Sequence, residues 1–272
     1  MSVEPESALG EIVRDPTYAG RVVKIVSRVA AARSPPQALE VLHAAKVEMG
    51  VDQAVFVSYI RDEDSHESYR FLLAADPQWC FEYQARAWYG SDPWLVYASQ
   101  NLETISASMI PVVTAQQREI RALAEKYEMV SVCIAPASSA GTNARIGMLA
   151  LGSARRGFFE DDAAFGLFKL LAHGLAMELH LWWNRYERDE LINTLRISDE
   201  DLSLLRLQLH GAGTKEACGE LGASSASIDS RWQRLNRKLG SPHRHASARL
   251  AAKFGLISNA TQPLSSHSLI RS

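Results

Sequence analysis

The spacing of apolar residues changes from helical to extended and back along the first two thirds of the chain. Residues 20–32 and 38–47 each carry apolar side chains on one face, and Ser34-Pro35-Pro36 separates them. This pattern predicts two helices, because Ser and Pro commonly end one helix and begin the next. Residues 53–60 and 68–75 are rich in β-branched and aromatic side chains on either side of the charged segment RDEDSHE. They predict a β-hairpin.

The pattern continues with helices and a second pair of strands. We expect helices over 79–89, from Asp92-Pro93 onward, and over 114–127, with a short strand within 104–113. Two apolar runs at 130–136 and 145–152, joined by ASSAGTNA, predict strands, and 159–187 predicts a long amphipathic helix. This order predicts an α+β fold for the N-terminal region: an α/β/α sandwich built on an antiparallel sheet.

The last quarter of the chain predicts only helices. Around Gly222, a helix break, two short helices are expected, and the second has Ile228, Trp232 and Leu235 on one apolar stripe. Its other faces carry polar side chains that can contact base edges or phosphates: Ser227, Asp229, Ser230, Arg231, Gln233, Arg234, Arg237 and Lys238. The pattern is typical of a recognition helix in a DNA major groove, and a solvated amphipathic helix of a helical bundle is the alternative.

The distribution of charge favours the DNA interpretation. The net charge of −2 hides 19 basic against 25 acidic residues in 1–197, and 9 basic against 6 acidic residues in 198–258. Between Ser224 and Lys253 the single acidic residue, Asp229, stands among seven basic ones. A basic surface confined to one region is the electrostatic property that binding to a duplex requires.

Other signals restrict the class of protein. Cys80, Cys133 and Cys218 are widely spaced and odd in number, so we expect neither a disulfide framework nor a zinc site. We interpret His243 and His245 as surface groups and predict no metal. The N-terminus lacks a signal-peptide pattern and the most apolar segment is interrupted by charges, so we expect a cytoplasmic protein without membrane spans. No nucleophile elbow, P-loop or HExxH motif indicates an enzyme.

Trp79, Tyr83 and Asp92 are the candidate ligand-binding residues. Trp79 and Tyr83 lie four residues apart, on one helix face, and Asp92 opens the next helix. Two N–H or O–H donors and one carboxylate acceptor match a small ligand with carbonyl and amide groups. From residue chemistry alone, a core Trp and Tyr with an Asp that only caps a helix is the simpler interpretation.

Both regions resemble one family, the LuxR-type quorum-sensing transcriptional regulators. In the N-terminal region the resemblance rests on PxW, Tyr and DP at these spacings, followed by strands ending in I-A-P. In the C-terminal region it rests on Ile197-Ser198, KE-A, R-K-L-G and G-L-I in fixed order. It implies an autoinducer-binding domain and a four-helix helix-turn-helix domain. It also implies that Trp79 donates to the lactone carbonyl of an N-acyl-homoserine lactone, Tyr83 contacts the amide carbonyl, and Asp92 accepts the amide N–H.

The resemblance implies a ligand-binding domain over 19–187 and a DNA-binding domain over 197–257. The polar composition of 1–18 predicts a flexible arm, the charged segment 188–196 predicts a linker, and 258–272 is a tail. The resemblance also implies a homodimer on a palindromic double-stranded DNA operator, and admits RNA polymerase as a partner. Trp182, Trp183, Tyr186 and the helix 245–254 are candidate dimer contacts.

The candidate pocket departs from the family pattern at four positions: Ala75, Ala107, Val132 and Ala150. Each lacks an aromatic or polar side chain that is frequent there, except Val132, which stands where Gly is common. Asp229 and Asp201 also depart from the pattern of the DNA-binding domain. Two alternatives therefore stay open. The protein either senses a lactone or a relative of one, or is a ligand-independent regulator or antagonist whose N-terminal domain mediates protein contacts.

Overall fold

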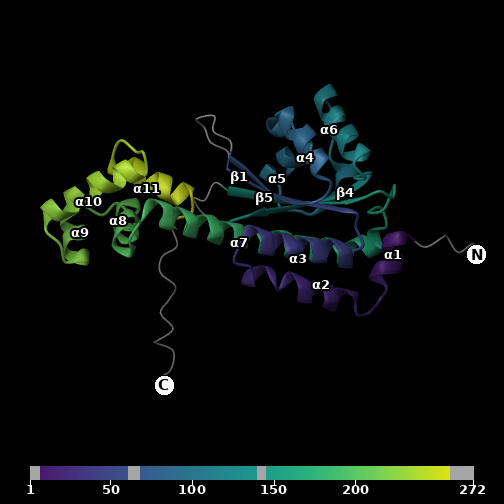
Figure 1. Cartoon of the computed structure of the whole chain (residues 1–272), viewed down its shortest axis with the longest axis horizontal. Coiled ribbons are helices and arrows are strands. Elements are labelled where there is room, and N and C mark those ends of the chain that lie inside the picture. The colour runs from purple at the N-terminus through teal and green to yellow at the C-terminus, as the bar shows by residue number, and fades with distance from the viewer. Residues whose placement is uncertain (1–6, 61–67, 140–144, 258–272) are drawn as a thin grey trace, which may run out of the picture. The chain divides into compact units, whose positions relative to one another are not determined.

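The computed structural model of the chain describes residues 7–60, 68–139 and 145–257. The chain divides into two compact units (Figure 1). The first unit comprises Met1–Ser138 and Ile146–Trp183, and the second comprises Ser139–Arg145 and Asn184–Ser272. The two hairpin loops expected around 61–67 and 140–144, and the predicted tail over 258–272, lie outside the described residues.

The first unit is built on a five-stranded antiparallel sheet in the order β2-β1-β5-β4-β3. Both expected strand pairs are confirmed, and the register of each places directly opposed residues such as Val57 and Phe71 side by side. The strands are β1 (Gln53–Ile60), β2 (Ser68–Ala74), β3 (Ile105–Ser106), β4 (Ser131–Ser138) and β5 (Arg145–Ser153). The predicted α+β class is therefore confirmed for this unit.

Helices cover both faces of the sheet (Figure 1). One face is covered by α4 (Pro77–Ala85), α5 (Pro93–Gln100) and α6 (Ala115–Lys126). The other face is covered by α3 (Pro35–Glu48) and α7 (Asp162–Leu195), and α2 (Tyr18–Val26) packs on the outer side of α3. The helix starts follow the local sequence. Asp92 caps α5 with Pro93 in its first turn, and Thr114 with Gln117 forms a reciprocal capping box at α6. The candidate site lies in the layer between the sheet and α4–α6.

The structure differs from the expected domain boundaries in two places. The predicted arm contains helix α1 (Ala8–Val13), capped by Ser7, and its Leu9 and the following Tyr18 are fully buried. The apolar side chains of this short segment therefore belong to the core, and the prediction of a loose arm is wrong for residues 7–18. The predicted linker 188–196 is helical as far as Leu195, because α7 continues through it without a break.

Two predicted elements are shorter than expected. The helix expected over 79–89 ends at Ala85, because Ala87 adopts a left-handed conformation (φ 49°) and the 3-10 helix η2 (Trp88–Gly90) follows. The strand expected within 104–113 is limited to β3, after which the 3-10 helix η3 (Ala107–Met109) turns the chain away. A further 3-10 helix, η1, spans Val29–Ala31.

The second unit consists of helices around its own apolar core. After the end of α7 these are α8 (Asp199–Leu209), α9 (Thr214–Leu221), α10 (Ser225–Lys238) and α11 (Arg244–Lys253). Gly222 closes α9 in the left-handed conformation (φ 59°), which glycine adopts without steric cost. Ser224 then caps α10, whose Ile228, Trp232 and Leu235 enter the core as predicted.

Candidate functional site

The structure brings Trp79, Tyr83 and Asp92 together in the core of the first unit. Trp79 and Tyr83 lie on α4, and their rings stack with centroids 5.2 Å apart. The Tyr83 hydroxyl donates a hydrogen bond to Asp92 Oδ2 over 2.7 Å. All three side chains are buried, with 6%, 2% and 3% of their surface exposed. Tyr83 and Asp92, nine residues apart in the sequence, are therefore in direct contact.

Asp92 caps α5 and holds Tyr83 at the same time. Its Oδ1 accepts hydrogen bonds from the backbone N–H groups of Trp94 (2.8 Å) and Leu95 (3.4 Å). Burial raises the pKa of Asp92 above its usual value, and the hydrogen bonds from Tyr83, Trp94 and Leu95 oppose that rise. Burial, followed by the nearby charge of Asp92, raises the pKa of Tyr83. Tyr83 therefore keeps its proton, which it donates to Asp92 Oδ2.

Trp79 is the unsatisfied member of this group. Its indole N–H is buried and has no hydrogen-bond partner among the residues that the structure describes. Leaving a buried donor unpaired costs about 1–3 kcal/mol, so such groups are rare in folded proteins. A buried N–H beside a paired hydroxyl and carboxyl group is suited to donate a hydrogen bond to a carbonyl oxygen of a bound molecule.

The four departures from the family pattern surround this site. Val132 and Ala150 belong to the buried cluster that contains Trp79 and Tyr83, and Ala75 and Ala107 pack against it. Ala107 and Val132 also line a hollow of about 60 Å³ beside Trp94. At Ala75, Ala107 and Ala150 the side chain is a single methyl group, which can neither donate nor accept a hydrogen bond.

Three tyrosines that sequence reasoning missed adjoin the site. Tyr59 on β1 and Tyr69 on β2 stack with centroids 5.2 Å apart, and Tyr69 stacks on Tyr89 of η2 at 3.9 Å. Tyr89 in turn meets Tyr83 edge to face at 5.3 Å. The hairpin register pairs Tyr59 directly with Tyr69, so alternation along the two predicted strands was the signal that could have found this pair.

In the second unit, α10 presents an exposed polar stripe. Ile228, Trp232 and Leu235 are buried on its opposite side. The residues of the stripe follow helical spacing and are all exposed: Ser227, Ser230, Gln233, Arg234 and Arg237. Arg234 also donates to the Ser230 hydroxyl over 3.0 Å. The stripe, called the α10 polar stripe below, contains five of the seven residues predicted to contact DNA.

The other two predicted DNA contacts, Arg231 and Lys238, are bonded to groups in the first turn of α8 and just before it. Arg231 forms ion pairs with Asp201 (3.3 Å) and Glu200 (2.5 Å) at the start of α8. Lys238 lies 3.5 Å from Asp201 and donates to the Arg196 carbonyl over 2.6 Å. Asp201 is buried and also completes a capping box with Ser198. These bonds hold α10 in place, and Asp201 is a positioning residue that sequence reasoning missed.

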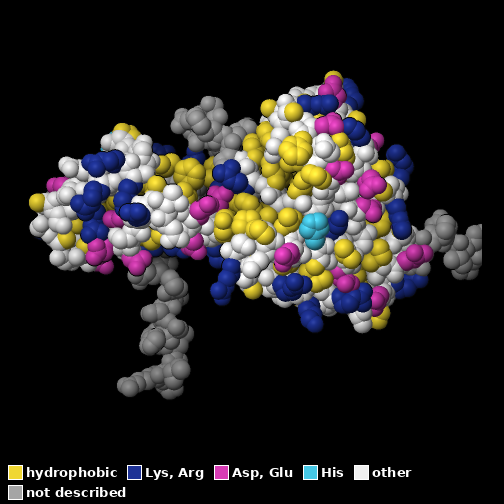
Figure 2. All heavy atoms as spheres, viewed as in Figure 1, with side chains coloured by type: hydrophobic (Ala, Val, Ile, Leu, Met, Phe, Trp, Pro, Cys, Tyr) yellow, Lys and Arg dark blue, Asp and Glu magenta, His cyan; other side chains and the backbone are white. Residues whose placement is uncertain are grey.

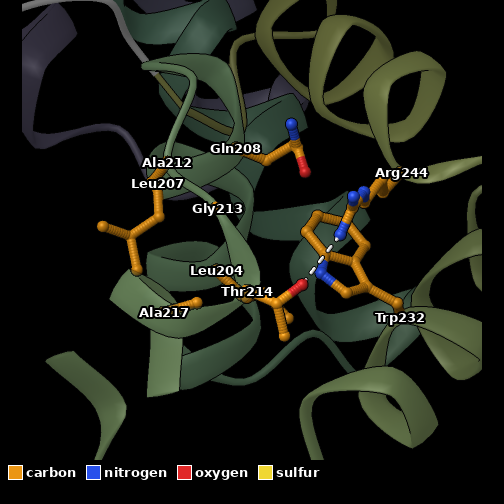
Figure 3. A pocket seen from close by; sticks show the side chains of 9 residues that line it. All are labelled: Leu204, Leu207, Gln208, Ala212, Gly213, Thr214, Ala217, Trp232 and Arg244. Atoms are coloured by element: carbon orange, nitrogen blue, oxygen red, sulfur yellow. Dashed lines mark hydrogen bonds between the residues drawn. The ribbon is translucent and has the colours of Figure 1, made fainter. Parts of the chain in front are cut away.

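Basic side chains gather on the visible face of the second unit (Figure 2). On its surface, Arg244 of α11 donates to the Thr214 hydroxyl at the start of α9 over 3.1 Å, across a depression of about 10 Å³ (Figure 3). That depression is too small for an organic ligand. Arg244 therefore joins α9 to α11 at this position.

The two histidines and the expected dimer contacts have local roles. His243 caps α11 by accepting the Ala246 N–H over 3.2 Å, and His245 lies 3.2 Å from the Gln208 amide. Among the described residues no cluster of His, Cys, Asp or Glu could hold a metal ion. Trp182 and Trp183 are buried, and Trp182 donates to the Ala32 carbonyl. They do not form an exposed contact surface. None of the helices in the described ranges is long and apolar enough to cross a membrane.

The chain was compared with protein families and with solved structures, and both comparisons found matches. A family described as "Autoinducer binding domain" matches residues 34–179. The structure of SdiA in complex with octanoyl-rac-glycerol is similar with a TM-score of 0.66 and 16% identity, over 91% of this chain and 100% of that one. A crystal structure of Escherichia coli SdiA has a TM-score of 0.62 and 15% identity, over 87% of this chain and 97% of that one.

A third similar structure covers less of the chain. The N-acylhomoserine lactone dependent LuxR-family transcription factor CepR2 from Burkholderia cenocepacia has a TM-score of 0.54 and 11% identity, over 62% of this chain and 98% of that one. No curated protein matches the sequence. At these identities the structural comparisons establish a shared fold.

Proposed function

The chain belongs to the autoinducer-binding domain family, and from that membership we propose that it is a transcriptional regulator whose DNA binding responds to a small signal. The first unit binds an N-acyl-homoserine lactone or a molecule with the same head group. The second unit binds a palindromic duplex as part of a homodimer, with RNA polymerase as a further partner.

The buried, unpaired indole N–H of Trp79 beside the Tyr83–Asp92 pair carries the ligand proposal. In the proposed complex, the lactone carbonyl accepts the Trp79 N–H. Satisfying that donor recovers the free energy that the ligand-free site loses, about 1–3 kcal/mol. The site therefore favours a ligand with a carbonyl oxygen at this position.

Tyr83 and Asp92 bind the ligand amide by exchanging hydrogen bonds. The Tyr83 hydroxyl has one proton, which it donates to Asp92 in the ligand-free structure. In the proposed complex it turns to the amide carbonyl, and Asp92 Oδ2 accepts the amide N–H in its place. The number of hydrogen bonds at Asp92 is conserved, and α5 keeps its cap through Oδ1.

The α10 polar stripe supports the DNA proposal. Its Arg234 and Arg237 are exposed, and Ser227, Ser230 and Gln233 supply short polar groups of the kind that bind bases and phosphates. The similarity to SdiA extends over 91% of the chain, so the shared fold reaches beyond the matched family domain. A two-fold symmetric dimer would bind half-sites about 34–36 Å apart, one turn of the duplex.

Ligand and DNA binding are coupled by linkage in this proposal. A signal that binds only the folded, dimer-competent state stabilises it by about 2.7 kcal/mol at a free concentration of 100 times Kd. That stabilisation changes the concentration of the DNA-binding form.

A ligand-independent regulator is the second candidate function. Small side chains at Ala75, Ala107 and Ala150 favour it, because they remove groups that could bind a ligand. Asp92 also has a complete structural role as a cap, which needs no ligand. In this alternative the first unit mediates protein contacts.

A thermal-shift screen separates the two functions. The full-length protein is heated with N-butanoyl-, N-hexanoyl- and N-octanoyl-homoserine lactones and with octanoyl-rac-glycerol, the molecule bound in the SdiA complex. Signal sensing predicts a rise in Tm with at least one of them, and a smaller rise in Asp92→Asn. No shift with any of them, together with operator binding by the ligand-free protein, would establish the second function.

A selection from random duplexes tests the DNA proposal. The wild type is expected to enrich a palindromic sequence, and Arg234→Ala is expected to enrich it weakly. Equal enrichment by both proteins, or none by the wild type, would remove the α10 polar stripe as the DNA-binding surface.

A further inference from the structure

The stacked tyrosines extend the candidate site in one direction. Tyr83 contacts Tyr89 edge to face, at an interplanar angle of 75°. Tyr89 then stacks on Tyr69 at 19°, and Tyr69 on Tyr59 at 17°. Tyr59 is fixed in place by a buried hydrogen bond from its hydroxyl to the Leu95 carbonyl, over 3.2 Å. The result is a row of rings, called the tyrosine stack below, that runs from Tyr83 to the sheet.

A hollow of about 150 Å³ lies against the tyrosine stack. Three of its four rings, those of Tyr59, Tyr69 and Tyr89, line it, together with Gly90, Ser99 and Gln100 among others. A cavity of about 150 Å³ is enough to hold one benzene ring. Aromatic rings gain from stacked and edge-to-face contacts beyond the area they bury. The Ser99 hydroxyl can accept, and the Gln100 amide can donate or accept, a hydrogen bond with a polar substituent.

We propose that the hollow selects a signal whose tail is a single planar aromatic ring with a polar substituent, over one with a long saturated chain. The inference rests on the proposed function, because the head of such a signal binds Trp79, Tyr83 and Asp92. A long alkyl chain gains no stacking with the tyrosines and, in a hollow of this size, has to displace them.

Gly90 offers a way to fill the hollow without disturbing the rest of the site. A Cβ atom added there meets no other atom within 4 Å, so a larger side chain enters open space. Gly20 on α2 has equally open surroundings and does not line the hollow. Gly90→Val and Gly20→Val are therefore matched variants, of which only the first narrows the hollow.

The test is isothermal titration of the full-length protein with 4-hydroxycinnamoyl-, N-dodecanoyl- and N-butanoyl-homoserine lactone. The wild type is expected to bind the hydroxycinnamoyl compound about tenfold more tightly than the dodecanoyl compound. Gly90→Val is expected to lose about tenfold in affinity for the hydroxycinnamoyl compound. It should keep its affinity for the butanoyl compound, whose tail is too short to fill the hollow. Gly20→Val should match the wild type with all three.

The outcomes distinguish the inference from the function on which it rests. Equal or tighter binding of the dodecanoyl compound, or unchanged hydroxycinnamoyl binding by Gly90→Val, would overturn the inference while the lactone site stands. If no lactone binds the wild type, the proposed function fails, and p-cresol becomes the probe. Binding of p-cresol that Gly90→Val abolishes would retain a ring-binding hollow, and no binding of p-cresol would overturn the inference as well.

Discussion

The two units hold their polar groups in opposite ways. In the first unit, Tyr83 and Asp92 are buried and bonded to one another, and the Trp79 N–H is buried without a partner. In the second unit the polar residues of the α10 polar stripe are exposed, while Arg231 and Lys238 bind Asp201. A buried site can specify a ligand through one missing hydrogen bond. An exposed helix needs other charges to position it before its free face can bind.

The largest expected effect is the loss of the buried acceptor in the first unit. Asp92→Ala removes the cap of α5 and leaves the Tyr83 hydroxyl without its partner. We expect the free energy of unfolding to fall by about 3 kcal/mol. Urea denaturation followed by tryptophan fluorescence measures it. A change below about 0.5 kcal/mol, within the usual range for surface substitutions, would contradict the buried role of Asp92.

The corresponding change in the second unit is Asp201→Ala, with Glu200→Ala as its control. Asp201 is buried and bound by Arg231 and Lys238, so its removal should destabilise this unit by about 2 kcal/mol. Glu200 also pairs with Arg231, but 66% of its side chain is exposed, and its removal should cost about 0.5 kcal/mol or less. Differential scanning calorimetry compares the two. Equal losses of stability in the two variants would mean that the burial of Asp201 does not make its ion pairs stronger than that of Glu200.

A smaller effect separates positioning from binding on α10 itself. Arg234→Ala should weaken operator binding by about tenfold and lower its salt dependence by about one counterion, with little change in stability. Arg231→Ala should mainly reduce stability, because its guanidinium binds Asp201. Fluorescence anisotropy at several salt concentrations, combined with thermal unfolding, gives both quantities. If Arg231→Ala lost operator affinity and Arg234→Ala lost stability, Arg231 would belong to the DNA-binding surface.

The smallest expected effect is the pH dependence contributed by Asp92. Burial raises its folded pKa above the ordinary value of 3.8, and three hydrogen bonds oppose the rise. Its stabilising contribution is therefore complete below the unfolded pKa and is lost as pH rises through the folded one. The stability of the wild type relative to Asp92→Asn should fall over that window, as measured by urea denaturation at each pH. A relative stability that increases with pH would mean that the hydrogen bonds outweigh burial.

Local features were predictable from the sequence and tertiary partners were not. The Asp92-Pro93 start of α5 and the core stripe of α10 follow from short-range preferences, and both are present. The inward direction of Arg231 depends on Asp201, which is 30 residues away in the sequence. Helical spacing alone could not separate it from Arg234.

The tyrosine stack was missed for the same reason. Tyr59 and Tyr69 were each predicted to lie on strands, but their contact with Tyr89 requires the turn after α4. That turn begins at Ala87, whose left-handed conformation no residue preference indicates, since alanine rarely adopts it. Helix α1 was missed because six residues give too short a periodic pattern to be recognised.

The unpaired indole N–H is the observation on which the ligand site most depends. Trp79→Phe removes that donor and keeps an aromatic ring against Tyr83. Isothermal titration of the wild type and Trp79→Phe with the lactone that gives the largest thermal shift tests its role. We expect the variant to bind about tenfold more weakly while its ligand-free secondary structure, checked by circular dichroism, stays unchanged. Equal affinity of the two proteins would contradict the claim that Trp79 donates to the ligand.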